Sequence, residues 1–267
     1  MFNINKILFI YLFSTIIFQV APNKFHYVKM NPRINNFLTT HKKKLLSSFK
    51  NKNLALLLNS FITGNKTKIP KTILTNYKLK SLKHLFTPSG IHYSSVYIVI
   101  LFLMSFVIKI KKIKIKLFIS IISLSVFYLQ KFYSLKRIVL FYLFKNISNF
   151  LGLKLSNFTI FLSVFVIDYY FGSFQKSPLS FTFSFLFLGT ILSCGPTLKM
   201  RFVGIMFAQL IISIVLDQNF NIIYSIQGFL LTSLFSFIFP IVLANYLLPM
   251  FNFSEPIIKI FNMLVTL

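Results

Sequence analysis

Acidic residues are almost absent from this sequence. Its 267 residues include 3 Asp and Glu against 29 Lys and Arg, which gives a formal net charge of +26. Charged residues make up 12% and hydrophobic residues 56%, against about 25% and about 45–50% in soluble domains. This composition excludes soluble globular, disordered, collagen-like and disulfide-rich proteins and predicts an all-α, polytopic integral membrane protein. The positive charge indicates an anionic partner, either lipid headgroups or nucleic acid.

The sequence is also poor in the residues that catalysis and metal binding require. A single cysteine, Cys194, allows no internal disulfide, and its apolar surroundings favour a small buried side chain. The four histidines and three acids form no H-x-H-x-D-H cluster and no Ser/His/Asp set, and the sequence has no Walker A motif. We therefore expect no enzyme activity, no metal and no cofactor.

Hydrophobicity and charge divide the chain into three segments. Residues 7–20 are apolar, so residues 1–21 are expected to form an uncleaved anchor, with a cleaved signal peptide or a short first helix as the alternatives. Residues 22–53 form a basic segment that we expect outside the cell membrane, and residues 54–267 form a membrane domain. Fourteen Lys and Arg without any acid in residues 22–83 predict short amphipathic helices lying at a membrane surface.

Long apolar runs in the rest of the chain predict roughly 6–8 transmembrane helices. The predicted spans are residues 93–110, 115–132, 155–174, 179–194, 201–217 and 222–250. The last run would form a helix kinked at Pro240 or two segments. Residues 135–151 predict a half-helix or an interfacial helix, and a further apolar run begins at residue 257.

A cluster of five lysines between the first two spans predicts the orientation in the membrane. These are Lys109, Lys111, Lys112, Lys114 and Lys116. Short lysine-rich loops stay in the cytoplasm, so the chain before residue 93 is expected on the outer side. The protein would then be a multi-pass protein of the cytoplasmic (inner) membrane with its basic segment exposed outside.

Residues 81–94, SLKHLFTPSGIHYS, predict a helix that breaks and restarts. Pro88 disfavours helix at the residue before it, Pro-Ser-Gly is typical of a turn, and Ser89 is a good N-cap for the next helix. Free N–H groups at a helix start can bind an anion, and His84 and His92 would flank this site. The alternative is an ordinary helix start at the membrane interface with two interfacial histidines.

The segment HLFTPSGIH resembles the H-L-x-x-S-G-x-H signature of the ComEC competence-protein family, the inner-membrane channel for DNA uptake. The resemblance covers about residues 54–250. Residues 54–70 resemble an apolar helix followed by a Gly-Asp turn, with Asn65 replacing the Asp. Residues 166–192 resemble the pattern D-P…P-x-F-x-L-S-F-x-x-x-x-G, with Tyr169 replacing its first Pro. The matched positions there are Asp168, Phe181, Ser184, Phe185 and Gly189, and Lys136-Arg137 stands where the family has an Arg.

The resemblance implies a channel that passes single-stranded DNA across the cytoplasmic membrane in natural transformation. It implies a DNA path formed by His84, Ser89, Gly90, His92, Arg137 and Ser184. Structural roles fall to Pro88, Asp168, Phe181 and Phe185. Lys42, Lys43 and Lys44 would attract the DNA phosphates through charge. The implied partners are single-stranded DNA, membrane lipids, a separate DNA receptor and an ATP-driven motor. The OB-like and metallo-β-lactamase-like domains of the family are not found in this sequence, so a separate metallo-β-lactamase-like chain is a further expected partner.

Asp168 stands alone in an apolar run. A charge at the bilayer centre costs about 2.5–3.5 kcal/mol, so we expect Asp168 to pair with Arg137 or Lys136. The alternative is a solvated position at the membrane edge.

Two other functional interpretations stay open. The chain could be a small-molecule or lipid transporter or a structural membrane subunit that retains anionic lipid through its lysines. It could also be a degenerate, nonfunctional relative of the ComEC family.

Overall fold

The computed structural model describes residues 32–266 apart from residues 88, 108–111, 129–131, 172–173, 175–176, 195–196 and 216–219. The predicted anchor at residues 1–21, Pro88, and Lys109 and Lys111 of the lysine loop lie outside the described residues. Every regular element in the described part is a helix, which confirms the all-α prediction. Contacts divide the chain into two compact units: unit 1 is Ile108–Ile222, and unit 2 combines Lys29–Val107 with Ile223–Leu267.

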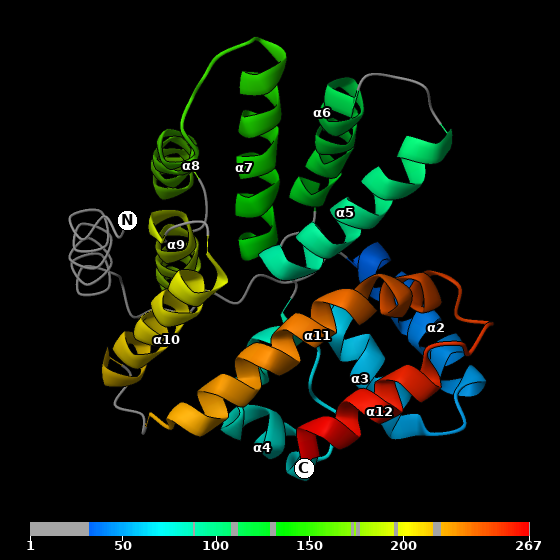
Figure 1. Ribbon diagram of the computed structural model, residues 1–267. Helices are drawn as coiled ribbons and strands as arrows, with labels where there is room; N and C mark the ends of the chain where they lie inside the picture. The colour runs from blue at the N-terminus through cyan, green and yellow to red at the C-terminus, as the bar shows by residue number, and fades with distance from the viewer. Residues whose placement is uncertain are drawn as a thin grey trace. The chain divides into compact units, whose positions relative to one another are not determined.

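The apolar runs of the sequence correspond closely to the observed helices (Figure 1). Unit 1 contains α6 (Lys112–Ser123), the 3-10 helix η2 (Leu124–Tyr128), α7 (Tyr133–Phe150), α8 (Asn157–Phe171), α9 (Pro178–Ser193) and α10 (Leu198–Val215). Unit 2 contains α2 (Pro32–Ser48), α3 (Lys52–Thr63), α4 (Lys71–Leu79), the 3-10 helix η1 (Leu82–Phe86), α5 (Gly90–Val107), nearly all of α11 (Ile222–Leu247), and α12 (Glu255–Thr266).

Three predicted elements differ from the observed ones. In the described part of the span predicted at residues 115–132, α6 ends at Ser123 and the 3-10 helix η2 follows. The run at residues 222–250 is one continuous helix with Pro240 inside it, so the two-segment alternative is wrong. Residues 135–151 lie in α7, a complete helix of 18 residues, so the half-helix alternative is also wrong. Asn146 does not interrupt α7, because its buried amide donates hydrogen bonds to the backbone oxygen of Lys116 at 3.2 Å and to Ser120 Oγ at 2.7 Å on α6.

Among the described helices, only α11 is long and apolar enough to cross a membrane, judged by length and composition. It has 26 residues, so it is about 39 Å long against a bilayer hydrocarbon core of about 30 Å. Shorter apolar helices cover Gly90–Phe106, Asn157–Phe171 and Ser180–Ser193. The polytopic arrangement stays a prediction.

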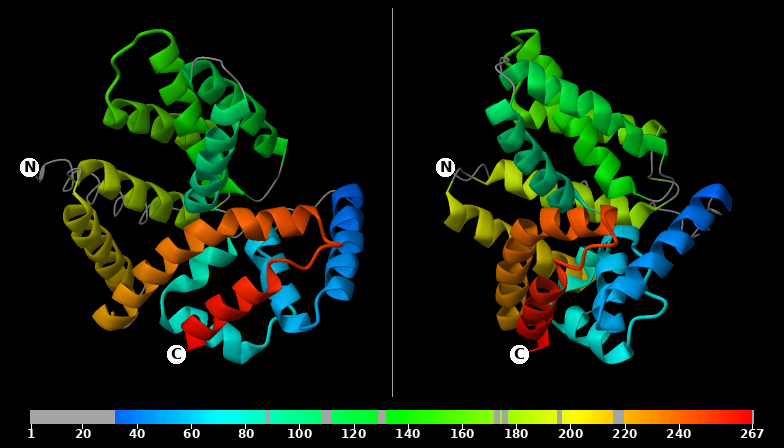
Figure 2. Two further views of the ribbon diagram at one scale, coloured as in Figure 1. Left: turned by 45° about the vertical axis from the view of Figure 1, so that its right-hand side comes forward. Right: turned by 90° about the vertical axis from the view of Figure 1, so that its right-hand side faces the viewer.

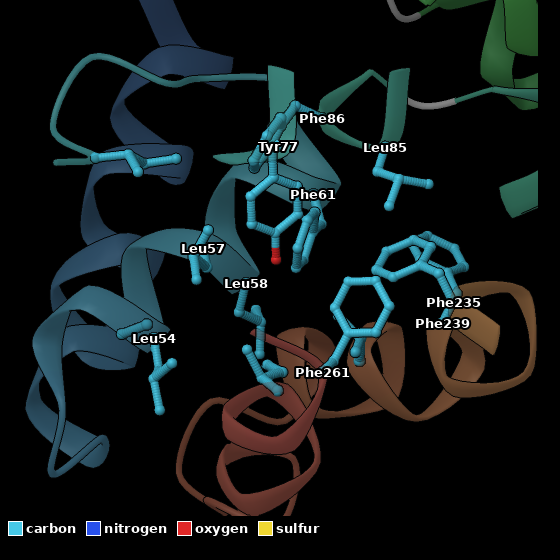
Figure 3. Close-up of a cluster of buried hydrophobic side chains, with 14 of the residues drawn as sticks. Leu54, Leu57, Leu58, Phe61, Tyr77, Leu85, Phe86, Phe235, Phe239 and Phe261 are labelled. Carbon is cyan, nitrogen blue, oxygen red and sulfur yellow. The ribbon is translucent and has the colours of Figure 1, made fainter. Parts of the chain in front are cut away.

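The core of unit 2 joins helices from both ends of the sequence. Figure 3 shows Phe61 and Tyr77 of the N-terminal helices facing Phe235 and Phe261 of α11 and α12. The ring centroids of Phe61 lie 4.8 Å from those of Phe235 and 5.3 Å from those of Phe86. All five side chains are buried, so this aromatic cluster serves as core.

The core of unit 1 is built from α7, α8 and α9, and α6 lies beside α7 in each view of Figures 1 and 2. Phe165 of α8 lies 5.1 Å from Phe181 and 4.8 Å from Phe185 of α9, measured between ring centroids. The phenylalanines predicted to have structural roles therefore lie inside a three-helix core.

Candidate functional site

The signature segment forms the predicted break between two helical elements. The 3-10 helix η1 ends at Phe86, Thr87 has extended backbone angles (φ −124, ψ 117), and α5 begins at Gly90. The carbonyl of Ser89 accepts the first hydrogen bond of α5, from Tyr93 N at 3.2 Å. Ser89 therefore occupies the N-cap position that the sequence predicts.

The His92 side chain forms hydrogen bonds to residues on both sides of this break. Its Nε2 lies 3.2 Å from the carbonyl oxygen of Leu85, which can only accept, so Nε2 carries the proton. Its Nδ1 then accepts from the backbone N–H of Ser89 at 3.1 Å and from the Ser89 hydroxyl at 2.8 Å. A side chain three residues into a helix that accepts from the N-cap N–H is half of a capping box. His92 is 2% exposed, so it positions the turn and lies away from the surface.

His84 ties the same segment to α11. Its Nδ1 donates to the carbonyl oxygen of Ser81 at 2.9 Å, and its Nε2 accepts from the Thr232 hydroxyl at 3.1 Å. Among the residues that the structure describes, Ser81 is the one non-glycine residue with a positive backbone φ, at 57°. The two histidines of the signature thus carry opposite tautomers, and each joins the break to a neighbouring backbone carbonyl.

Lysines crowd the surface beside the break. Lys66 Nζ lies 5.4 Å from the centre of the Phe86 ring at the end of η1. Burial and the charge of Lys83 lower the pKa of Lys66, so the two ammonium groups are close enough to repel. The same holds for Lys42 of α2, whose pKa is lowered by burial and by the charge of Lys68.

The loop that carries two of these lysines is fixed by its own polar side chains. Gly64 ends α3 with a left-handed φ of 74°, which confirms the predicted polar turn after residue 62. Asn65 Oδ1 then accepts from the backbone N–H and hydroxyl of Thr67 at 3.1 and 2.8 Å. We name Lys42, Lys66, Lys68 and Lys83 the lysine quartet. Lys43 and Lys44 of α2 are exposed.

Four of the predicted site residues converge in unit 1. Arg137 Nε lies 2.7 Å from Asp168 Oδ2, and Arg137 Nη1 donates to the Ser180 carbonyl at 2.6 Å. The guanidinium carbon lies 5.3 and 5.6 Å from the ring centres of Phe181 and Phe185. Arg137 and Asp168 are 1% and 6% exposed. The expected pairing of Asp168 with Arg137 is confirmed, and the solvated alternative for Asp168 is wrong.

This burial changes what the predicted path residues can do. Arg137 was expected along the DNA path, but its guanidinium is engaged by Asp168, by a carbonyl and by two aromatic faces, so it joins α7, α8 and α9. Ser184 is half-buried, and its Oγ lies 3.3 Å from Ser134 Oγ. Gly90 is half-buried at the start of α5.

Two buried polar residues that organise unit 2 were missed from the sequence. Lys80 is 8% exposed, and its Nζ donates to the Leu264 carbonyl near the end of α12 at 3.4 Å. Asn245 is fully buried and accepts from the N–H and hydroxyl of Ser254 at 2.9 and 2.7 Å. A polar residue inside an apolar run, as at Asn245, is the signal that could have found it.

Within the part of the chain that the structure describes, no group of three or more His, Cys, Asp or Glu side chains could hold a metal ion. No family model, no curated protein and no solved structure matches this chain.

Proposed function

We propose that this chain is a multi-pass membrane protein that binds single-stranded DNA and conducts the strand across the cytoplasmic membrane during natural transformation. The observation that carries the proposal is a pair of mutually repelling lysines, Lys66 and Lys83, at the helix break. Lys83 belongs to η1 itself, and Lys66 lies over the ring of Phe86 at its end. A passing phosphate backbone would relieve the repulsion within each lysine pair.

The geometry moves the proposed phosphate contacts away from the signature histidines that the ComEC resemblance implies. The signature histidines are engaged in holding the break, so phosphate contacts fall to the lysine quartet and to the N-terminus of α5. Residues 29–107 and 223–267 contain a single acid, Glu255, and its carboxylate already accepts from backbone N–H groups. A polyanion would therefore meet little repulsion on unit 2.

The exposed apolar side chains support a membrane location. Phe106 of α5, Phe171 of α8 and Phe237 of α11 are 74%, 87% and 79% exposed. Soluble monomers rarely leave large contiguous apolar surfaces uncovered, whereas lipid tails would cover these helices. With no nucleotide-binding motif in the sequence, a separate motor and receptor would have to deliver the strand.

The lysine quartet gives the first test. Lys66→Gln with Lys83→Gln should weaken binding of the purified, membrane-reconstituted protein to a single-stranded oligonucleotide. The slope of log affinity against log salt should fall by about 0.7 for each lost phosphate contact. The control is Lys71→Gln with Lys78→Gln, two exposed lysines of α4 whose removal lowers net charge equally. Equal losses in both variants would mean that only bulk charge matters.

The same variants distinguish DNA binding from the alternative function, in which the lysines retain anionic lipid. If the site binds DNA, the amount of phosphatidylglycerol that co-purifies with the Lys66→Gln, Lys83→Gln protein should equal that of the parent. A loss of that lipid with unchanged DNA affinity would instead support a membrane subunit that holds anionic lipid.

The helix start gives the test of conduction. Replacing Gly90 by Leu should abolish DNA uptake in a host that depends on this chain, because the side chain would crowd the start of α5 while the segment stays apolar. Membrane abundance, measured in the same cells, should remain normal. Uptake equal to the parent at equal abundance would make the signature an interfacial helix start only.

The topology is tested with single cysteines in a Cys194→Ser background. Thr67→Cys should react with an impermeant thiol reagent in intact cells, and Lys114→Cys should react only after the cells are broken. The reverse pattern would place the lysine quartet in the cytoplasm and remove its role in capturing external DNA.

A further inference from the structure

The connection between α11 and α12 exposes an unusual run of apolar side chains. Leu247, Leu248, Met250, Phe251 and Phe253 are 65%, 53%, 84%, 60% and 42% exposed. We name residues 247–253 the apolar loop. It follows directly on the end of α11, the described helix that is long enough to span a bilayer.

The apolar loop is held in a fixed shape by buried polar groups beneath it. Asn245 donates its side-chain N–H to the carbonyl of Phe251 and accepts from Ser254. Phe251 N also donates to the Leu248 carbonyl at 3.1 Å. Both Asn245 and Ser254 are fully buried. Such bracing keeps the apolar side chains outside when collapse onto the core would otherwise bury them.

Basic residues surround the base of the loop. Glu255, the first residue of α12, accepts from the backbone N–H groups of Lys50 and Asn51 at 3.1 and 2.8 Å, which places the connection between α2 and α3 beside the loop. Lys50 and Lys52 are exposed there, and Lys259 is exposed one turn further along α12. On the other side, His41 of α2 packs its ring 4.6 Å from that of Tyr246 at the end of α11.

We propose that the apolar loop inserts into the interfacial layer of an anionic lipid leaflet, with Lys50, Lys52 and Lys259 contacting the headgroups. Exposed aromatic and aliphatic side chains beside exposed lysines are an arrangement that anchors proteins in a membrane interface. The residues beside the apolar loop carry positive charge, and the one carboxylate described there, that of Glu255, already accepts hydrogen bonds. The occupant of this surface is therefore a negatively charged lipid layer. The inference rests on the proposed membrane location of α11.

The experiment places an environment-sensitive dye at single cysteines in the full-length Cys194→Ser protein, reconstituted in vesicles of phosphatidylcholine and phosphatidylglycerol. At Met250→Cys the dye should emit at shorter wavelength than in water and be quenched by lipids that carry a nitroxide high on the acyl chain. At Asn65→Cys, in the exposed polar loop, it should report water. Met250 and Asn65 are both exposed, and the Asn65 side chain bonds to Thr67 within its own loop, so neither change should disturb the core of unit 2.

A third position separates failure of this inference from failure of the proposed membrane location. At Phe237→Cys, in the middle of α11, the dye should be quenched by nitroxides deep in the bilayer. Lipid quenching at 237 with a water-like signal at 250 would overturn the inserted loop alone. Water-like signals at both positions would overturn the membrane location of α11 as well.

The charge of the leaflet is tested by the identity of the quenching lipid. Nitroxide-labelled phosphatidylglycerol should quench the dye at 250 more strongly than labelled phosphatidylcholine. In Lys50→Gln with Lys52→Gln the two lipids should become equal quenchers. Equal quenching in the parent protein would overturn the preference for anionic lipid.

Discussion

The two units stabilise their buried polar groups in different ways. In unit 1 the centre is an ion pair, Arg137 with Asp168, enclosed by two phenylalanine rings. In unit 2 the polar joints run from side chains to backbone groups, as from His92 to Leu85, from Asn245 to Phe251 and from Lys80 to Leu264. Unit 1 thus depends on charge balance between helices, whereas unit 2 depends on hydrogen bonds at the points where its helices break and turn.

Breaking the ion pair should have the largest effect. Asp168→Ala leaves the Arg137 guanidinium buried without its carboxylate, and breaking a buried pair costs about 3–5 kcal/mol. We expect the protein to accumulate poorly or to unfold at a much lower temperature, measured by circular dichroism in detergent. The double variant Arg137→Met with Asp168→Leu removes both charges and should recover most of the loss. A single variant as stable as the parent would contradict the role of the pair.

Removing the histidine of the break should have the next largest effect. His92→Ala leaves the Ser89 N–H and the Leu85 carbonyl without this partner, and each buried group left unpaired costs about 1–3 kcal/mol. His92→Gln should recover part of the stability, because glutamine at this position can accept from the N-cap N–H. His84→Ala, on an exposed side chain, should change the melting temperature much less. Equal effects of the two alanine variants would show that burial of His92 is unimportant.

One tightly packed glycine in each unit allows the tolerance of the two units to an added methyl group to be compared. A Cβ at Gly228 would lie 2.2 Å from the backbone oxygen of Lys80, whereas one at Gly204 would lie 2.3 Å from Cys194 Sγ. Overpacking of this kind costs about 1–3 kcal/mol. Gly204→Ala should be partly relieved by adding Cys194→Ala, because the nearest clashing atom belongs to that side chain, while Thr190 Cγ2 at 2.9 Å stays. Melting temperatures of the three variants would test this, and Gly228→Ala should be the harder one to rescue.

The smallest effect concerns pH. Partial burial raises the pKa of Glu255, but hydrogen bonds from Asn252, Asn51 and Lys50 outweigh it and hold the pKa below its ordinary value of 4.5. A lowered carboxyl pKa stabilises the fold above pH 4.5, and that contribution is lost as the pH falls through the folded pKa. Glu255→Gln should therefore reduce the drop in melting temperature between neutral pH and a pH of about 3.5. An unchanged drop would mean that other groups control it.

The sequence predicts local structure well because the signals are local. Apolar runs mark the helices, Gly64 marks the end of α3, and a lone Asp168 requires a partner with opposite charge. The S-x-x-H spacing of Ser89 and His92 also carried the capping interaction, since a helix places these residues next to each other. Free N–H groups at a helix start predict an anion site here, but the Ser89 N–H donates to His92.

Long-range packing could not be predicted from the sequence. Phe61 packs against Phe235 and Phe261, which lie far away in the sequence. The pattern of apolar residues in either segment does not indicate this contact. The resemblance assigns Phe181 and Phe185 structural roles, but their contact with Arg137 was not predicted, because nothing in their spacing distinguishes them from lipid-facing phenylalanines. Lys80 looked like another surface lysine, and only the position of α12 shows why it is buried.

Unit 2 is built from two separate parts of the sequence, so its helices are synthesised at different times. Its first part, up to Val107, leaves the ribosome well before α11 and α12 exist, and unit 1 lies between them in the chain. At about 5–20 residues per second, Phe86 waits roughly 10–35 s for Phe261. During that interval the face of α3 that carries Leu57, Leu58 and Phe61 lacks the cover that α11 and α12 later provide. The nascent chain therefore needs a temporary host for this face, which a chaperone or the insertion machinery would provide.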